Sequence, residues 1–252
     1  MVKLDVSLVA RVTERCNLDC KYCYLDKKRP NDMPLGVAEE LVSQLINYND
    51  YKAHFVWAGG EPLLRPDSFF ESIIEFSKKY NHKELTVTHS IQTNGILLTK
   101  ERGEFLIGIG FKLGVSYDGC DDLQNCQRPT KNRNEQSFQL LKNIKDAGKR
   151  LGIITVLTKN SVGREREIYE SLSRITRFAR VNFYAPTGEG LNRQDELLPT
   201  RKEAESMLLN FYELWKNDDS DFQLRPFLDI VKSFFTGLPI NCEYSAVSCY
   251  RI

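Results

Sequence analysis

The sequence predicts an α/β fold built on a parallel sheet, and two observations carry this prediction. Short runs rich in β-branched and aromatic residues recur up to about residue 190, and amphipathic helical patterns lie between them. Several runs are apolar almost throughout, which is typical of strands that are covered on both faces. Six β–α alternations of this spacing fit either an open doubly wound sheet or a partial barrel.

Six strands are expected in chain order, and they are SLVARVT (7–13), HFVWAG (54–59), HSIQTN (89–94), FKLGVSY (111–117), GIITVLT (152–158) and RVNFYAP (180–186). Apolar residues at helical spacing predict helices over 35–46, over about 67–80, and over 138–147 with Gly148 as a stop signal. After residue 190 the strand patterns cease. Residues 201–216 and 222–235 are expected to be helices, the second starting near Pro226.

Composition narrows the class of protein. The 252 residues permit one large α/β domain or one domain with an appendage. The net charge of +1 does not indicate a nucleic-acid partner. We see no apolar signal run and no stretch approaching ~20 apolar residues, so we expect no membrane association and a soluble, cytoplasmic protein. In a reducing cytoplasm, clustered cysteines indicate metal binding or catalysis rather than disulfides.

Polar or glycine-rich segments follow five of the expected strands. They are the cysteine-rich ERCNLDCKYCY, then GGEP, TNG, SYDG and APTGEG. Gly, Asn and Asp also form ordinary turns, so any one segment alone is weak evidence. In parallel α/β sheets and barrels, however, sites form at the carboxyl ends of the strands. Five such segments in succession favour a site.

Three cysteines, Cys16, Cys20 and Cys23, are candidate metal ligands. A structural zinc site takes four ligands, and no histidine lies nearby in the sequence. An iron–sulfur cube is usually held by four thiolates, so three would leave one iron with an open coordination site. The alternatives are three buried cysteines, or a zinc loop completed by Cys242 or Cys249.

The spacing Cys-x3-Cys-x2-Cys after the first strand resembles the signature of the radical S-adenosylmethionine (SAM) superfamily. The resemblance implies a partial (β/α)6 TIM-type barrel and a [4Fe-4S] cluster on the three cysteines, with SAM on the open iron. It implies reductive cleavage of SAM to methionine and a 5′-deoxyadenosyl radical, which abstracts hydrogen from the substrate. GGEP, with Gly59, Gly60 and Glu61, resembles the segment that accepts the SAM amino group; backbone carbonyls and the Glu61 carboxylate suit an ammonium.

A narrower resemblance is to anaerobic sulfatase-maturating enzymes and related SPASM-domain peptide maturases, on CNLDCKYCY, GGEPLL, HSIQTNGILL and GVSYDG. It implies that Ser116 and Arg128 bind the SAM carboxylate, although Arg128 could instead be a surface arginine. Gln92 and Asn94 are expected to touch substrate or the SAM ribose, or only to form turns. Tyr22 is expected to pack against the adenine, or only to shield the cluster. Asp118 and Gly119 are expected to shape their loop, and the backbone of 183–186 to read the adenine edge.

The resemblance places a radical SAM barrel at 1–190 and a helical extension at 191–252, with the possible start of an auxiliary-cluster region. SPASM enzymes carry about seven further cysteines there, whereas this chain has Cys242 and Cys249. Auxiliary [4Fe-4S] clusters are therefore expected only if the natural chain is longer. Cys120 and Cys126 are auxiliary ligands, substrate-side thiols or incidental. No catalytic acid or base can be placed from the residues.

The favoured function is a radical SAM oxidoreductase that oxidises or cross-links a peptide or protein side chain, that is, a peptide maturase. Its partners would be that substrate and an electron donor such as flavodoxin or ferredoxin. The alternative is a radical SAM dehydrogenase of a small molecule such as an aminosugar. A third possibility, from a different class, is a non-catalytic iron–sulfur or zinc module.

Overall fold

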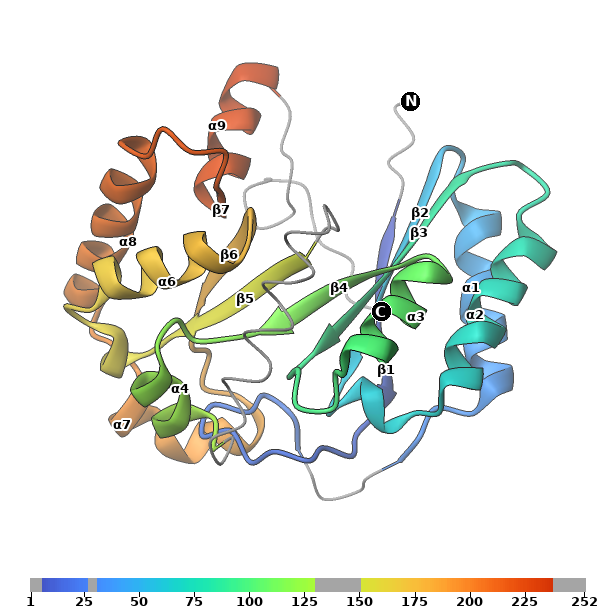
Figure 1. The fold of residues 1–252 in the computed structure, drawn as a ribbon, viewed down its shortest axis with the longest axis horizontal. Coiled ribbons are helices and arrows are strands. Elements are labelled where there is room, and N and C mark those ends of the chain that lie inside the picture. Colours follow the sequence, from blue (N-terminus) through green and yellow to red (C-terminus); the bar gives the residue numbers. More distant parts are fainter. Residues whose placement is uncertain (1–5, 27–30, 130–150, 238–252) are drawn as a thin grey trace.

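The computed structural model describes residues 6–26, 31–129 and 151–237, which form a seven-stranded parallel sheet with helices on its outer face (Figure 1). The strands are β1 (Ser7–Thr13), β2 (Lys52–Gly59), β3 (Thr86–Thr93), β4 (Phe111–Ser116), β5 (Leu151–Leu157), β6 (Phe178–Phe183) and β7 (Gln223–Arg225). Their order in the sheet is their order in the chain. A doubly wound sheet would reverse direction at a switch point. The sequential order therefore selects the partial barrel, with β1 and β7 as its edges among the described strands.

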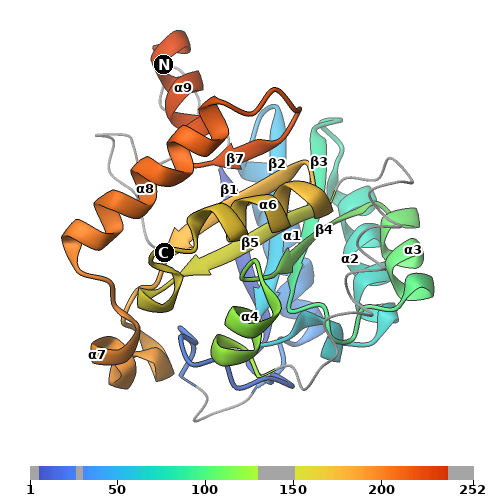
Figure 2. The ribbon, with the colours of Figure 1, turned by 60° about the vertical axis from the view of Figure 1, so that its left-hand side comes forward.

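The helices are α1 (Leu35–Tyr48), α2 (Asp67–Tyr80), α3 (Lys100–Gly108), α4 (Asp121–Gln127), α6 (Glu165–Ile175), α7 (Gln194–Leu197), α8 (Arg201–Lys216) and α9 (Phe227–Thr236), with 3-10 turns η1 (Pro62–Leu64), η2 (Lys159–Ser161) and η3 (Gly188–Arg193). Figure 2 shows α6 and α8 outside β5 and β6. The helix expected at 138–147 lies outside the described residues. Within those residues, no helix combines the length and apolar character needed to cross a bilayer.

The two faces of the sheet differ in chemistry because side chains alternate along each strand. On the outer face, Phe55, Trp57 and Ile91 are fully buried beneath the helices. On the inner face, many of the alternating positions hold polar residues such as Ser90 and Gln92, which are partly exposed, although Ile154 and Phe178 are apolar. The hydrophobic core therefore lies between sheet and helices, and the interior of the barrel is left for binding.

All six expected strands are confirmed, but the expectation that strands cease after residue 190 is wrong. Residues Gln223–Arg225 form β7, which pairs with β6, and the expected helix over 222–235 begins only at Phe227. Pro226 explains the boundary, since proline disfavours helical backbone in the residue before it. Leu224 and Phe227 enter the same core as the strands. The domain boundary near residue 190 stays a prediction.

Four helices were not singled out by the sequence: α3, α4, α6 and α7. Three of them are short, at four to nine residues, and their apolar patterns are correspondingly brief. In α6, only Ile168, Tyr169, Leu172 and Ile175 carry the apolar buried face, among many charged residues. Their stability comes from packing against the sheet rather than from intrinsic helix preference.

Candidate active site

The three cysteines lie on the loop that follows β1, at the carboxyl ends of the strands (blue, at the bottom of Figure 1). Cys16, Cys20 and Cys23 form no disulfide with any described residue, and each is partly buried. The loop folds on itself: the Leu18 amide donates to Cys16 Sγ at 3.4 Å, and the Cys23 amide donates to the Cys20 carbonyl at 3.1 Å. Three thiols on one short loop can converge on a single compact metal group.

The GGEP segment is fastened to the start of the cysteine loop. The amide of Gly60 donates to the Thr13 carbonyl at 2.8 Å, and the amide of Glu61 donates to the Arg15 carbonyl at 2.8 Å. A Cβ atom at Gly59 would overlap the Thr13 carbonyl oxygen, and one at Gly60 would overlap that of Arg15. Gly59 also has a φ of 133°, in the region that favours glycine. Both glycines are therefore needed for the loops to approach this closely.

The Glu61 carboxylate organises the loops around it. The side chain is 0% exposed. It accepts hydrogen bonds from the Leu63 amide at 2.9 Å, the Thr93 hydroxyl at 2.6 Å and the Asn94 amide at 2.7 Å. Burial raises the pKa of Glu61, and these donors oppose that shift. The carboxylate is thus committed to η1 and the end of β3, which leaves backbone carbonyls of GGEP as the candidate acceptors for a SAM ammonium.

Gln92 and Asn94 take different places, although both were expected in the cavity. Asn94 Nδ2 donates to Asn17 Oδ1 at 2.7 Å and lies 3.9 Å from Cys16 Sγ, so this side chain joins the cysteine loop. Gln92 Nε2 donates to Ser116 Oγ at 3.0 Å, across the inner face of β3 and β4. A Cβ atom at Gly114 would overlap the Gln92 side chain, so glycine there gives Gln92 its space.

Tyr22, Asp118 and Arg128 form a buried polar network behind the cysteines. Arg128 Nη1 donates to the Tyr22 hydroxyl at 2.8 Å, and that hydroxyl donates to Asp118 Oδ2 at 2.7 Å. Arg128 is 6% exposed and Asp118 is 0% exposed. Burial disfavours the charged guanidinium, but Tyr22, Cys20 and Asp118 outweigh it and hold the pKa of Arg128 above its ordinary value. Arg128 therefore stays a cation beside the cysteine loop.

The Nε atom of Arg128 is buried, and among the described residues it has no hydrogen-bond acceptor. Buried N–H donors without a partner are rare in folded proteins, so this one needs an explanation. A carboxylate is the acceptor that best suits a guanidinium edge. The orphaned donor fits the expected contact with the SAM carboxylate. No described hydrogen bond joins Arg128 to Ser116, so their joint action stays a prediction.

The remaining site residues line the same end of the barrel. The Tyr22 ring packs with Tyr184 and Leu197 in a small buried cluster, so its contact with adenine stays a prediction, as does that of the 183–186 backbone. Asp118 shapes its loop as expected, since it also accepts from the Val156 amide at 3.1 Å. Gly119 has a φ of 103°, and a Cβ atom there would press on Ile168.

No individual role could be read from the sequence for Asn17, Gly188 or Gly190, although the glycines belong to the APTGEG segment and Asn17 to the cysteine-rich one. The Gly190 amide donates to the Cys23 carbonyl at 2.8 Å, and a Cβ atom at Gly188 would overlap the Tyr24 carbonyl. The glycines of APTGEG were a usable signal for this close approach. The role of Asn17 could not be read from its neighbours in the chain, because its partner Asn94 is distant in sequence.

The chemistry of the donor set fits an iron–sulfur cluster. Burial raises the pKa of Cys20 to about 11, with Arg128 opposing the shift. A bound metal would favour the thiolate strongly. The fit rests on three thiols on one loop, glycine-dependent approach of the neighbouring loop and the unpartnered Arg128 donor.

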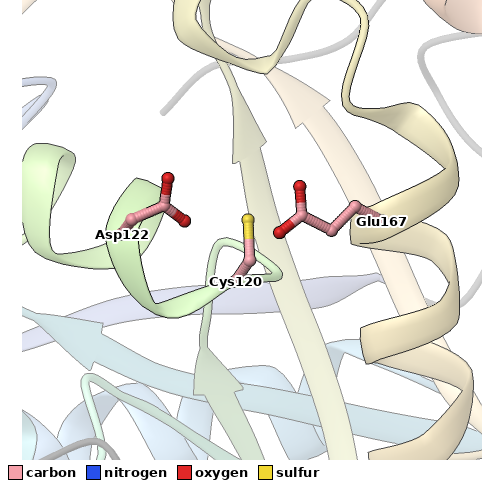
Figure 3. A group of neighbouring side chains, drawn as sticks. All are labelled: Cys120, Asp122 and Glu167. Atoms are coloured by element: carbon pink, nitrogen blue, oxygen red, sulfur yellow. The ribbon is translucent and has the colours of Figure 1, made fainter.

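Another group of potential metal ligands, with one cysteine and two acids, lies outside the cysteine loop. The ligand atoms of Cys120, Asp122 and Glu167 lie within 4.8 Å of one another (Figure 3). Arg164 already pairs with both carboxylates, with hydrogen bonds of 2.7 Å to both Asp122 oxygens and 2.9 Å to Glu167. These contacts describe an arginine-centred surface network that needs no metal. Cys126 is exposed, and Cys242 and Cys249 lie outside the described residues.

Comparison with known proteins identifies the class. The family model for the radical SAM superfamily matches residues 11–172, and the chain therefore belongs to this superfamily. Radical SAM proteins use a [4Fe-4S] cluster and SAM. This assignment confirms the resemblance read from the three cysteines.

Among curated relatives, the chain is similar to the cysteine-type anaerobic sulfatase-maturating enzyme of Clostridium novyi strain NT. The identity is 27% over 251 residues, which are 93% of this chain and 67% of the relative. The serine-type enzyme of Bacteroides thetaiotaomicron is 37% identical over 132 residues, covering 49% of this chain and 32% of the relative. The chain spans about two thirds of the length of the first relative.

Solved structures share the fold. The native anSMEcpe structure with bound AdoMet superposes with a TM-score of 0.82 at 24% identity, covering 94% of this chain and 68% of that one. Streptococcus suis SuiB bound to the precursor peptide SuiA gives a TM-score of 0.65 at 20% identity, covering 87% of this chain and 48% of that one. These likenesses establish the radical SAM type of barrel.

Proposed function

We propose that this radical SAM protein is an oxidoreductase that modifies a peptide or protein side chain by oxidation or cross-linking. The observation that carries the proposal is the cysteine loop, held by the GGEP segment, by Asn94 and by the Gly188–Arg193 turn. With the cluster on Cys16, Cys20 and Cys23, reductive cleavage of SAM supplies methionine and a 5′-deoxyadenosyl radical.

The protein's own residues bind and orient. The carbonyls near Gly59 and Gly60 accept from the SAM ammonium, while the unpartnered Arg128 Nε binds the SAM carboxylate. Tyr22, Tyr184 and Leu197 close the site on one side and exclude water. The linked pair Gln92 and Ser116 presents hydrogen-bonding groups to the ribose or the substrate from the inner face of the sheet.

The relatives support a peptide substrate. One anSMEcpe structure contains AdoMet and the Kp18Cys peptide, and one SuiB structure contains the SuiA precursor peptide. The proposed chemistry also needs one electron for each SAM cleaved, and we assign its supply to a flavodoxin or ferredoxin. The reduced state that three cluster thiolates require agrees with a cytoplasmic location.

The test is anaerobic reconstitution of the chain with iron and sulfide, followed by reduction with dithionite in the presence of SAM. The wild type should produce 5′-deoxyadenosine and methionine, whereas Cys20→Ala should produce neither. Cys126→Ala is the matched control, because Cys126 is exposed and lies off the cysteine loop. Normal 5′-deoxyadenosine formation by Cys20→Ala would refute the cluster assignment.

A further inference from the structure

The inner face of the sheet encloses a cavity of about 400 Å³. Its wall includes the first residues of several strands, so it extends toward their amino-terminal halves, away from the cysteine loop. Gln92 also lines it, and Gln92 donates to Ser116 at the carboxyl end of β4. The cavity therefore adjoins the proposed SAM site and is the natural place for the substrate.

The strands around this cavity carry charge of one sign. None of the seven strands contains an aspartate or glutamate. Their lysines and arginines all fall on inner-face positions, as the parallel register shows, and they are Arg11, Lys52, Lys112, Arg180 and Arg225. Three of these line the cavity: Lys112, Arg180 and Arg225. A random scatter of surface charge would place acids on this face as well.

Among the described residues, one carboxylate from the helices packed nearby faces two of these three cations. Asp229 of α9 is 1% exposed and lies 3.5 Å from Arg180 Nη2 and 3.3 Å from Arg225 Nε. In the described part of the chain, no acid lies within ion-pair distance of Lys112. Counted over the described residues, the cavity wall therefore carries an excess of positive charge. Burial, and then Lys112 and Arg225, lower the pKa of His54 in the same wall, so the field of these cations reaches into the cavity.

We infer that this cavity receives a carboxylate of the substrate, placed by Lys112 with Arg225 and Arg180. The inference rests on the proposed function and deepens it, since it makes the substrate an acidic peptide. Lys112 and Arg225 are exposed to solvent, while Arg180 is partly buried. A carboxylate that enters the cavity can accept charge-assisted hydrogen bonds from all three side chains. A cavity of this volume admits a short peptide segment rather than a folded domain.

A larger hollow of about 680 Å³ lies between α6 and α8, on the outside of the barrel. Acidic residues such as Glu170, Glu213 and Asp219 line it, and none of the proposed SAM residues does. Its charge is opposite to that of the barrel cavity. The two hollows therefore suit ligands of opposite charge, and of these two only the cavity inside the barrel adjoins the proposed SAM site.

The experiment offers the anaerobically reconstituted 252-residue protein two pools of synthetic N-acetylated decapeptides of random sequence. One pool is amidated at the C-terminus, and the other has a free terminal carboxylate. Affinity selection with mass spectrometry then reports which residues are enriched. We expect peptides with Asp or Glu to be enriched about tenfold over their Asn and Gln counterparts in the amidated pool, equal to about 1.4 kcal/mol.

Lys112→Gln should remove most of this enrichment, and Lys112→Glu should reverse it toward Lys and Arg. Lys52→Gln and Lys52→Glu are matched controls: they change the net charge equally at an inner-face position that does not line the cavity. If peptides bind selectively only in the free-acid pool, the cavity receives the C-terminal carboxylate of the peptide rather than an Asp or Glu side chain. Lack of acidic enrichment in both pools, or equal loss in the Lys52 variants, would overturn the inference.

The result can be separated from that of the proposed function. Peptide selection is an equilibrium measurement and needs no SAM cleavage. Wild-type protein that fails to make 5′-deoxyadenosine but still selects acidic peptides would refute the proposed function and keep the cationic cavity. Protein that makes 5′-deoxyadenosine but does not select acidic peptides would support the proposed function and overturn the inference about the cavity.

Discussion

At the scale of single residues, Arg128 has the least ordinary environment in the described structure. It is almost fully buried, it binds the Tyr22 hydroxyl, and its Nε atom lacks an acceptor. The sequence suggested Arg128 only through the family resemblance, since a lone arginine in a polar segment is usually a surface residue. Burial and the orphaned donor could not be read from the residues, because they depend on how α4 packs behind the cysteine loop.

Removal of Arg128 should weaken SAM binding. Arg128→Ala loses a hydrogen bond between charged groups, so we expect the free energy of binding to fall by about 1.5–3 kcal/mol. Arg128→Lys should recover only part of it, because lysine lacks the planar fork. Equilibrium dialysis with labelled SAM on reconstituted protein measures both. Arg166→Ala, on an exposed site of α6, is the control, and unchanged affinity in Arg128→Ala would remove this residue from the site.

His89 makes stability depend on pH. Trp57 Nε1 donates to His89 Nδ1 at 3.0 Å, so the ring is neutral and its Nε2–H donates to Ser77 at 2.9 Å. Burial lowers the pKa of His89 from 6.5 to about 4. Between pH 6.5 and about pH 4, His89 is therefore protonated in the unfolded chain but neutral in the folded chain. The stabilisation is complete above pH 6.5 and is lost as the pH falls from there toward 4.

From pH 8 to pH 5.5 this one group should cost about 1.4 kcal/mol of unfolding free energy. Urea unfolding at the two pH values measures the difference. His89→Phe should abolish this contribution, since phenylalanine can fill the ring's place beside Phe55, although it will lower stability at both pH values. His82→Asn, at an exposed position, should leave the pH dependence intact. If the difference in unfolding free energy between pH 8 and pH 5.5 is unchanged in His89→Phe, another group causes the pH dependence.

At the scale of elements, strands were easier to predict than the contacts between loops. Period-two alternation and apolar runs located all six expected strands, because burial on the sheet is a local pattern. The short β7 was missed, since three residues carry too little pattern. Glu61 shows the second limit. The contact of Glu61 with SAM stays a prediction, and the three donors that occupy its carboxylate come from η1 and from the end of β3, which only the fold brings together.

The close approach of the GGEP segment to the cysteine loop predicts a sharp effect of one methyl group. A Cβ atom at Gly60 would overlap the Arg15 carbonyl oxygen, so Gly60→Ala should push the loops apart and cost about 1–3 kcal/mol of stability. The iron bound after reconstitution should fall as well. Thermal unfolding and iron analysis measure the two effects.

Gly36→Ala is the matched control, because an added Cβ atom there meets nothing within 4 Å and the position lies in α1. A glycine inside a helix is less favourable than alanine by about 0.5–1 kcal/mol, so this variant should be slightly more stable. Equal behaviour of the two variants would mean that the loops do not depend on the glycine.

At the scale of the whole molecule, the sheet separates two functions between its faces. Its outer face carries the apolar core, while its inner face carries all the strand cations and the cavity. The sequence identified the chemistry at the carboxyl ends of the strands, because the three cysteines are a compact local signal. It did not reveal the cationic cavity, because Lys112, Arg180 and Arg225 are far apart in sequence and meet only through the parallel register.

The number of clusters is a property of the whole chain. Four thiolates usually hold an auxiliary cluster, and Cys242 and Cys249 supply only two. Cys120 is a poor additional ligand, since Arg164 already bridges the two acids beside it. We therefore expect the 252-residue chain to bind about four irons, all lost in Cys20→Ala and all retained in Cys242→Ala and Cys249→Ala. Iron and sulfide analysis decides the matter: about eight irons, with loss of half in Cys249→Ala, would show that this chain assembles a second cluster.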